Sequence, residues 1–248
     1  MKDREFGVEL EFDSNGIGIS GVGDLLWENG FREEWCGIRS SYYGERQYSR
    51  IGWDGSEVEL KTPILRGKKG FDDLKAVVKL LYDEGCYTTE EDGLHVHHNA
   101  PEFVNNKPLV IKLLRSWKNN EQHICDFIDQ ERVGWSLEYD GPCPSFPRDK
   151  IDEFENSNRA TFGSWERYNL NVNALTKHGS VEFRLHEGSL FWDEIESWIR
   201  FGQYFLNGVL QRKNPIAEVD SPVVLMNRLK TNKKTKVMLA RKAGLALS

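Results

Sequence analysis

Five short segments of this chain alternate between apolar and polar residues, and this period of two constrains the fold more than any other feature. Side chains alternate across a β-strand, so each segment is predicted to be a strand with one apolar and one polar face. The segments lie within residues 4–12, 56–62, 93–99, 168–174 and 180–186. A sheet built from them packs one face on helices and leaves the other open.

Helical periodicity separates and follows these strands. The expected helices lie at 24–30, 70–84, 107–130 and 193–209, and the C-terminal third is helical as well. Hairpin-connected strands that are then interrupted by helices indicate an α+β fold with a mainly antiparallel sheet and helices packed on its outer face.

Three segments are expected to be irregular. Residues 13–23 are turn-rich, and "TKHG" is read as a tight turn between the last two strands. Residues 134–167 are rich in Pro, Gly, Ser and Arg. A segment of this length is too long for an idle connection, which favours a lid or binding loop.

The length of 248 residues fits one large domain or a domain with an appendage. We divide the chain into a main domain at 1–210 and a basic helical extension of the same domain at 211–248. No acidic residue follows Asp220, whereas Lys and Arg recur to the end. The simplest interpretation of this basic run is a solvated helix face, and contact with phosphate groups or a partner is the alternative. The net charge of −6 argues against a nucleic-acid binder.

The four cysteines, Cys36, Cys86, Cys125 and Cys143, are far apart and form no CxxC pair. They match neither a zinc ribbon nor a disulfide-dense secreted scaffold, so reduced thiols are expected. The segment "MKDREFGVE" has no apolar core of a signal peptide, and no stretch reaches the ~18 apolar residues of a membrane span. We therefore expect a cytoplasmic protein without a membrane partner.

The polar faces of the predicted strands are unusually rich in Glu, His, Asn and Arg. If the strands share one sheet, five carboxylates converge, those of Glu9, Glu11, Glu57, Glu59 and Glu182. Carboxylates packed so closely repel, so either some are protonated or a cation holds them together. Oxygen-rich clusters of this kind suit Mg²⁺ or Mn²⁺. For any single strand, an ordinary solvated face is the better interpretation.

A nucleotide is the partner that such cations imply, because Mg²⁺ usually completes its coordination with water and substrate phosphates. The phosphate-loop pattern GxxxxGK[ST] does not occur, so metal and side chains would hold the phosphates. Arg184 lies on the same predicted face and would neutralise charge on a transferred phosphoryl group. His97 would ligate Mn²⁺ or donate to a phosphate, unless it is simply satisfied inside the sheet.

Five motifs, in order, resemble the amidoligase family, which is similar to the glutamine synthetase and γ-glutamylcysteine ligase superfamily. They are "FGVELEF", "WDGSEVELKTPIL", "GLHVHHNA", "YNLNVNAL" and "VEFRLHEGSL". The resemblance spans about residues 4–205. It implies the curved antiparallel sheet of the glutamine synthetase catalytic domain over 1–210.

The resemblance also implies an ATP-dependent carboxylate–amine ligase. ATP would phosphorylate a carboxylate, and an amine of a small molecule, peptide or protein would attack the acyl phosphate. The implied metal ligands are Glu9, Glu11, Glu59 with Glu57 or Asp54, His97 and Glu182. The implied catalytic residues are Arg184, Glu59 and Glu182, and the candidate ATP contacts are Arg184, His97, Arg159 and Arg167. Further candidates are Arg39, Arg46 and Arg50 as anion anchors, and Glu166, Glu187 and Asp193 for the amine.

Two other function classes compete with a ligase. Asp54, Glu59 and Lys61 have the spacing of a metal-dependent PD-(D/E)xK nuclease, and the basic tail would hold DNA. That interpretation leaves Glu9 and His97 unexplained. The third class is an inactive nucleotide- or metal-binding protein that acts through its partners.

Overall fold

A six-stranded antiparallel sheet lies at the centre of the computed structural model, which describes residues 3–40, 46–54, 57–130, 132–133, 143–163 and 168–245. The six strands follow the order β4–β5–β1–β6–β8–β7. They are β1 (Phe6–Phe12), β4 (Ile51–Asp54), β5 (Glu57–Lys61), β6 (Gly93–Asn99), β7 (Leu170–Asn171) and β8 (Ser180–Glu187). A separate two-stranded sheet pairs β2 (Ile38–Ser40) with β3 (Arg46–Tyr48).

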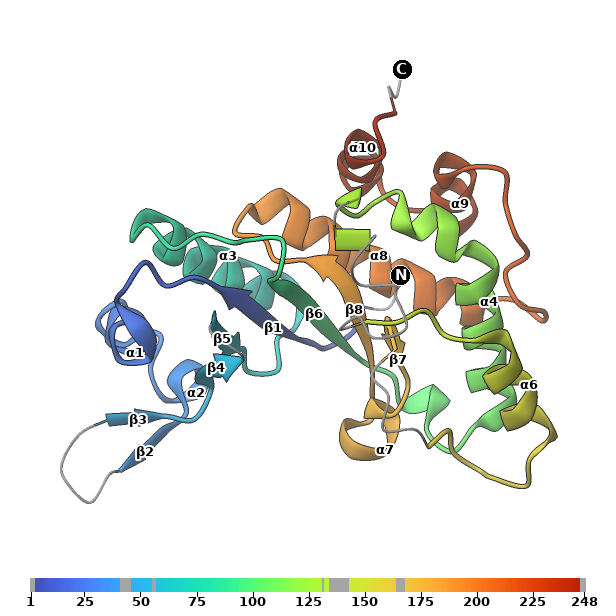
Figure 1. Cartoon of the computed structure of the whole chain (residues 1–248), viewed down its shortest axis with the longest axis horizontal. Helices are drawn as coiled ribbons and strands as arrows, with labels where there is room; N and C mark the ends of the chain where they lie inside the picture. The colour runs from blue at the N-terminus through green and yellow to red at the C-terminus, as the bar shows by residue number, and fades with distance from the viewer. Residues whose placement is uncertain are drawn as a thin grey trace.

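Helices pack on the apolar face of the central sheet and on one another, and one short helix lies over the polar face (Figure 1). They are α1 (Gly18–Glu28), α2 (Glu33–Cys36), α3 (Gly67–Asp83), η1 (Pro101–Phe103), α4 (Lys107–Cys125), α6 (Arg148–Asn156), α7 (Ala174–His178), α8 (Trp192–Leu210), α9 (Pro222–Leu229) and α10 (Lys233–Lys242). Phe6 of β1 packs on Phe71 of α3 with ring centroids 4.8 Å apart, and Phe183 of β8 contacts Trp117 of α4 at 5.4 Å. This aromatic layer forms the core.

The predicted α+β fold with a mainly antiparallel sheet is confirmed. The periodicity at 70–84 and 193–209 corresponds to α3 and α8, because both helices bury their apolar side against the sheet. The likeness of the sheet to the glutamine synthetase catalytic domain stays a prediction. Within the described part of the chain, every helix is too short or too polar to cross a bilayer.

The turn-rich interpretation of residues 13–23 is confirmed for residues 13–17 but is wrong for residues 18–23, because α1 begins at Gly18. Glycine serves close packing there. A Cβ at Gly23 would lie 2.2 Å from the ring of Tyr48, whose hydroxyl donates to Asp24 Oδ1 at 2.6 Å. Gly23 therefore lets the helix approach the small sheet, which a propensity argument does not detect.

The strand predicted at 168–174 is shorter than expected. The side chain of Asn171 accepts a hydrogen bond from the backbone N–H of Asn173 at 3.0 Å, which turns the chain out of the sheet. The one-turn helix α7 follows in place of the predicted tight turn, and Gly179 ends it with φ +66°. This short helix brings Lys177 and His178 over the polar face of the sheet.

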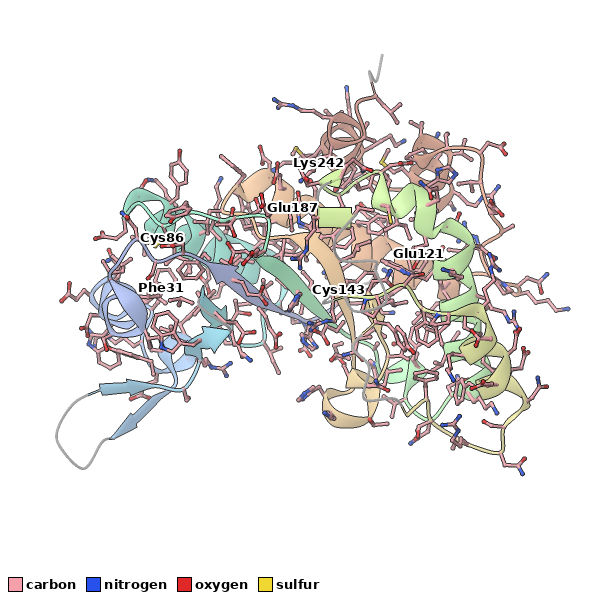
Figure 2. All side chains as sticks on the ribbon, in the orientation of Figure 1. Phe31, Cys86, Glu121, Cys143, Glu187 and Lys242 are labelled. Carbon is pink, nitrogen blue, oxygen red and sulfur yellow. The ribbon has the colours of Figure 1, made fainter. Side chains whose placement is uncertain are left out.

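The predicted lid at 134–167 contains the helix α6, which buries Ile151 and Phe154. Residues 134–142 and 164–167 lie outside the described residues. At the C-terminal end, α9 and α10 bury Leu225, Met226 and Leu239 in the core. Lys242 of α10 pairs with Glu187 at the end of β8 (Figure 2). The division of the chain at residue 210 stays a prediction.

Candidate active site

The polar face of the central sheet carries its functional side chains in three rows that run across neighbouring strands. Strand register sets these rows, because residues directly opposite each other in an antiparallel pair share a face. The rows are Gly7–His97–Glu182–Asn171, Lys61–Glu9–His95 and Glu59–Glu11. Residues from five strands therefore meet on one open face.

The first cluster within these rows consists of Glu9, His97 and Glu182. His97 Nε2 lies 3.6 Å from Glu9 Oε1 and 3.7 Å from Glu182 Oε1. The other ring nitrogen, Nδ1, lies 3.1 Å from the hydroxyl of Ser180, which orients the imidazole. One ligand atom from each of the three residues falls within 4.8 Å of the others, which is the spacing of a metal site.

The second cluster consists of Glu9, Glu59 and His95, and its ligand atoms also lie within 4.8 Å of one another. His95 Nδ1 is 3.4 Å from Glu9 Oε2. Glu9 thus contributes to both clusters, with one carboxylate oxygen next to His97 and the other next to His95. A carboxylate placed in this way can bridge two cations.

Charge compensation explains how buried carboxylates coexist here. Burial raises the pKa of Glu9, but hydrogen bonds with His95 and His97 outweigh it and hold that pKa well below its usual range. Burial lowers the pKa of His95, but contacts with the Cys143 thiol and Glu9 raise it to about 9. Burial raises the pKa of Glu59, which the ion pair with Lys61 only partly offsets. The site therefore depends on positive charge close to its carboxylates.

Arg184 and Glu182 form a buried ion pair at the edge of the first cluster. Arg184 Nη1 donates to Glu182 Oε1 at 2.5 Å, and Asn171 Nδ2 donates to the second oxygen at 2.6 Å. Burial raises the pKa of Glu182, but the charge of Arg184 outweighs it and lowers that pKa. Arg184 is therefore a fixed, permanently charged donor beside the clusters.

A cavity of about 600 Å³ lies over both clusters, and we call it the main cavity. Its walls include Arg184, Lys177 and Asn173 as well as Glu9 and Glu59. The volume is within the range of pockets that hold drug-sized ligands. Its polar lining and the two clusters suit an anionic ligand that binds through cations.

A family model described as "Putative amidoligase enzyme" matches residues 38–206, which is more than half of the chain. The chain belongs to the amidoligase family. No curated protein matches the chain. Membership indicates a ligase-type enzyme that acts on a carboxylate and an amine. The match starts after β1, so Glu9 comes from outside it and reaches the site through the pairing of β1 with β5 and β6.

Glu9, Glu59, His97, Glu182 and Arg184, predicted from sequence, are brought together. Glu11 lies beside them, but its Oε2 accepts the backbone N–H of Gly93 at 2.6 Å, and it belongs to neither cluster. Its role as a metal ligand stays a prediction.

Other candidates lie elsewhere. Arg159 is exposed and is not part of the main cavity. Glu187 and Asp193 pair with Lys242 and Lys234. Glu166 and Arg167 lie outside the described residues, as do the side chains of Arg39, Arg46, Asp54 and Glu57.

Alternation along residues 168–174 and 180–186 assigns Asn169 and His186 to the polar face, and both assignments are wrong. The register between β6 and β8 shifts by one residue between Leu94 and Val96, so His186 opposes Leu94 and turns to the helix side. Its ring lies 5.1 Å from that of Trp198 in α8. Asn169 is also fully buried, and its side chain joins Trp117 of α4. Neither change is visible in an alternating pattern, because a bulge depends on the partner strand.

Sequence reasoning missed Cys143 and Arg132, which close the buried side of the site. The Cys143 thiol lies 3.2 Å from the carbonyl oxygen of Arg184. Burial raises its pKa, but His95, Arg184 and Arg132 together lower it. Cys143 reaches the site from an irregular segment and Arg132 from a helical one, and neither belongs to a motif that would have identified it.

Proposed function

We propose that this amidoligase-family protein is an ATP-dependent carboxylate–amine ligase that works through an acyl phosphate. The observation that carries the proposal is the position of Glu9, which is shared by two clusters of potential metal ligands beside Arg184. This arrangement suits a triphosphate bound through divalent cations on an open sheet face.

The donor set supports Mg²⁺ or Mn²⁺ as the cation. Carboxylate oxygens dominate both clusters, and each cluster adds one imidazole nitrogen, which Mn²⁺ accepts more readily than Mg²⁺. Glu9, Glu182 and His97 would hold one ion, and Glu9, Glu59 and His95 the other. When bound, such ions neutralise phosphate charge and align the triphosphate.

The proposed reaction has two steps. An oxygen of the substrate carboxylate attacks the γ-phosphorus of ATP, the bond to ADP breaks, and an acyl phosphate forms. The nitrogen of the amine then attacks the acyl carbon, inorganic phosphate leaves, and the nitrogen loses a proton. Arg184 stabilises the charge that develops on the transferred phosphoryl group, and its ion pair with Glu182 keeps the guanidinium in place.

Calorimetry with a non-hydrolysable ATP analogue and Mg²⁺ tests the proposal. The wild-type chain should bind the analogue in the presence of Mg²⁺, and Glu9→Gln should weaken this binding by about tenfold or more, because it removes a charge from both clusters. Glu153→Gln is the matched control, since Glu153 is exposed on α6 and, within the described residues, pairs with Lys150 of the same helix at 3.0 Å. Binding that is absent, or equal in Glu9→Gln, would contradict the proposal.

An inactive binding protein would pass that test, so turnover needs its own measurement. ADP release screened over pairs of acids and amines separates the two classes. Release that depends on both an acid and an amine supports the ligase, whereas binding of nucleotide without release under any pair supports the inactive protein.

A further inference from the structure

A second cavity, of about 440 Å³, adjoins the main cavity along β1, and we call it the side cavity. Both cavities share the wall formed by Glu9, Lys61, His97 and His178. The side cavity therefore opens directly onto the cluster of Glu9, His97 and Glu182. A molecule in it has one end at the proposed cation site.

Gly7 forms the floor of the side cavity. It lies on the polar face in the same row as His97, so any side chain at this position would project into the cavity. A Cβ built at Gly7 meets only Thr62 Oγ1, at 3.9 Å, which is ordinary contact distance. The backbone there also lacks a positive φ. The fold therefore does not require glycine at residue 7, and the effect of glycine is to keep the cavity open.

Arg50 provides the charge at the far side of the cavity. Its Nη1 donates to the carbonyl oxygen of Thr62 at 2.9 Å, and Thr62 is anchored to β1 because its Oγ1 accepts the N–H of Val8 at 2.9 Å. Among the described residues, no carboxylate forms an ion pair with Arg50. Glu5, the other acidic residue beside Glu9 in the lining, accepts from Asn99 at 3.0 Å and faces Arg66 at 3.7 Å.

The positions of these charges fit an acid with two anionic groups. Arg50 and the Glu9 end of the cavity lie on opposite sides of β5, so their backbones are separated by two strand spacings, about 10 Å. A short carbon chain with an anionic group at each end spans such a gap. A guanidinium held by one backbone carbonyl has further N–H groups that match a carboxylate.

We propose that the side cavity binds the acid substrate, and that this substrate is a small dicarboxylic acid. One carboxylate lies at the Glu9–His97 end, where it is activated, and the other binds Arg50. The assignment rests on the proposed ligase function for the direction of the reaction. It makes Gly7 and Arg50 the residues that set which acid is accepted.

Binding of free acids to the full chain tests the assignment without nucleotide. The probes are dicarboxylates from malonate to adipate, with and without an α-amino group, and monocarboxylates of equal length, all followed by saturation-transfer NMR with Mg²⁺. At least one dicarboxylate should bind about tenfold more tightly than its monocarboxylate, because a charge-assisted hydrogen bond is lost. Gly7→Val and Arg50→Gln should each weaken that dicarboxylate by about tenfold or more.

Gly52→Val is the matched control, because Gly52 lies on the same sheet face outside both cavities and a Cβ there meets nothing within 4 Å. It should leave the acid affinity unchanged. If Gly7→Val fails to fold, Gly7→Ala and Arg50→Gln carry the test.

The outcomes separate this assignment from the proposed function. If no dicarboxylate binds, or Gly7→Val and Arg50→Gln bind it as the wild type does, the side cavity is not the acid site, whatever the nucleotide does. If the ATP analogue with Mg²⁺ does not bind while the dicarboxylate does, the ligase function fails and the cavity keeps its ligand. Unchanged binding of the ATP analogue in both variants supports a separate acid site.

Discussion

Arg184 Nη1 donates to Glu182 Oε1 at 2.5 Å, and the two residues lie two apart on the same face of β8. Asn171 from β7 holds the other carboxylate oxygen at 2.6 Å. The side chains of Arg184 and Glu182 are almost fully buried. Glu182 therefore both belongs to a metal-ligand cluster and fixes the direction in which Arg184 points.

The first prediction concerns the orientation of the Arg184 guanidinium. Arg184→Lys keeps the charge but loses the planar fork that Glu182 orients, so kcat should fall by about 10²–10³ with little change in the KM for ATP. Steady-state ADP release measures both constants, and thermal unfolding checks that the variant is folded. A kcat within about threefold of wild type would show that Arg184 does not face the transferred phosphoryl group.

A second prediction separates the ligase from the nuclease. Lys61 Nζ lies 2.7 Å from Glu59 Oε2, so it has the neighbour expected of a nuclease lysine. In the ligase, Lys61→Ala should reduce ADP release by only about tenfold or less, because Lys61 is a half-exposed charge partner, whereas Glu9→Ala should abolish it. Plasmid cleavage with Mg²⁺ or Mn²⁺ is the parallel assay. Cleavage that Lys61→Ala abolishes would favour the nuclease.

A third prediction follows from His98, which is buried on the helix side of β6 against Gly202 and Phe183. Burial lowers its pKa to about 3, so the folded protein keeps it neutral. In the unfolded chain, the His98 side chain takes up a proton below pH about 6.5. The contribution of His98 to stability is therefore complete above that pH and falls by up to about 1.4 kcal/mol per pH unit below it, until the pH approaches about 3.

Urea unfolding at pH 7.5 and pH 5.0 measures this loss. His98→Leu removes the titrating group, so the free energy of unfolding should fall less between the two pH values than it does in wild type. Part of the loss should remain, because burial also lowers the pKa of His186 well below its usual value. An equal loss in His98→Leu and wild type would contradict the prediction.

A fourth prediction concerns Glu121 of α4 (Figure 2), whose side chain is buried. Its carboxylate accepts from Asn169 Nδ2 at 2.7 Å, from Lys118 at 2.6 Å and from Ser145 at 2.7 Å. The backbone carbonyl oxygen of Asn169 in turn accepts a hydrogen bond from the backbone N–H of Arg184 at 2.9 Å. Glu121→Gln turns one acceptor into a donor, so the free energy of unfolding should fall by about 1–3 kcal/mol.

Glu155→Gln is the control for Glu121→Gln, because Glu155 of α6 is exposed and pairs with Arg115 of α4. Exposed pairs contribute at most about 1 kcal/mol, so this variant should unfold near the wild-type urea midpoint. A Glu121→Gln midpoint equal to that of the control would show that the buried network does not hold the segment around Ser145.

Alternation along each strand was sufficient to place several site residues correctly. Glu9, Glu59 and His97 lie on the face that the pattern predicts, because the pleat of a strand makes residues two apart share a face regardless of context. The amphipathic helices α3 and α8 follow for the same reason, since a period of 3.6 residues is a local property of the backbone. Family membership agrees with motifs that are also read along the chain.

Contacts between strands decided the rest. The bulge opposite His95 sends His186 to the helix side, and the pairing of β1 between β5 and β6 makes Glu9 the residue common to both clusters. Gly7 becomes a cavity floor only because His97 is its neighbour across the strands. Register and burial depend on residues far apart in the chain, so a linear pattern shows which side of a strand is polar but not which polar groups meet.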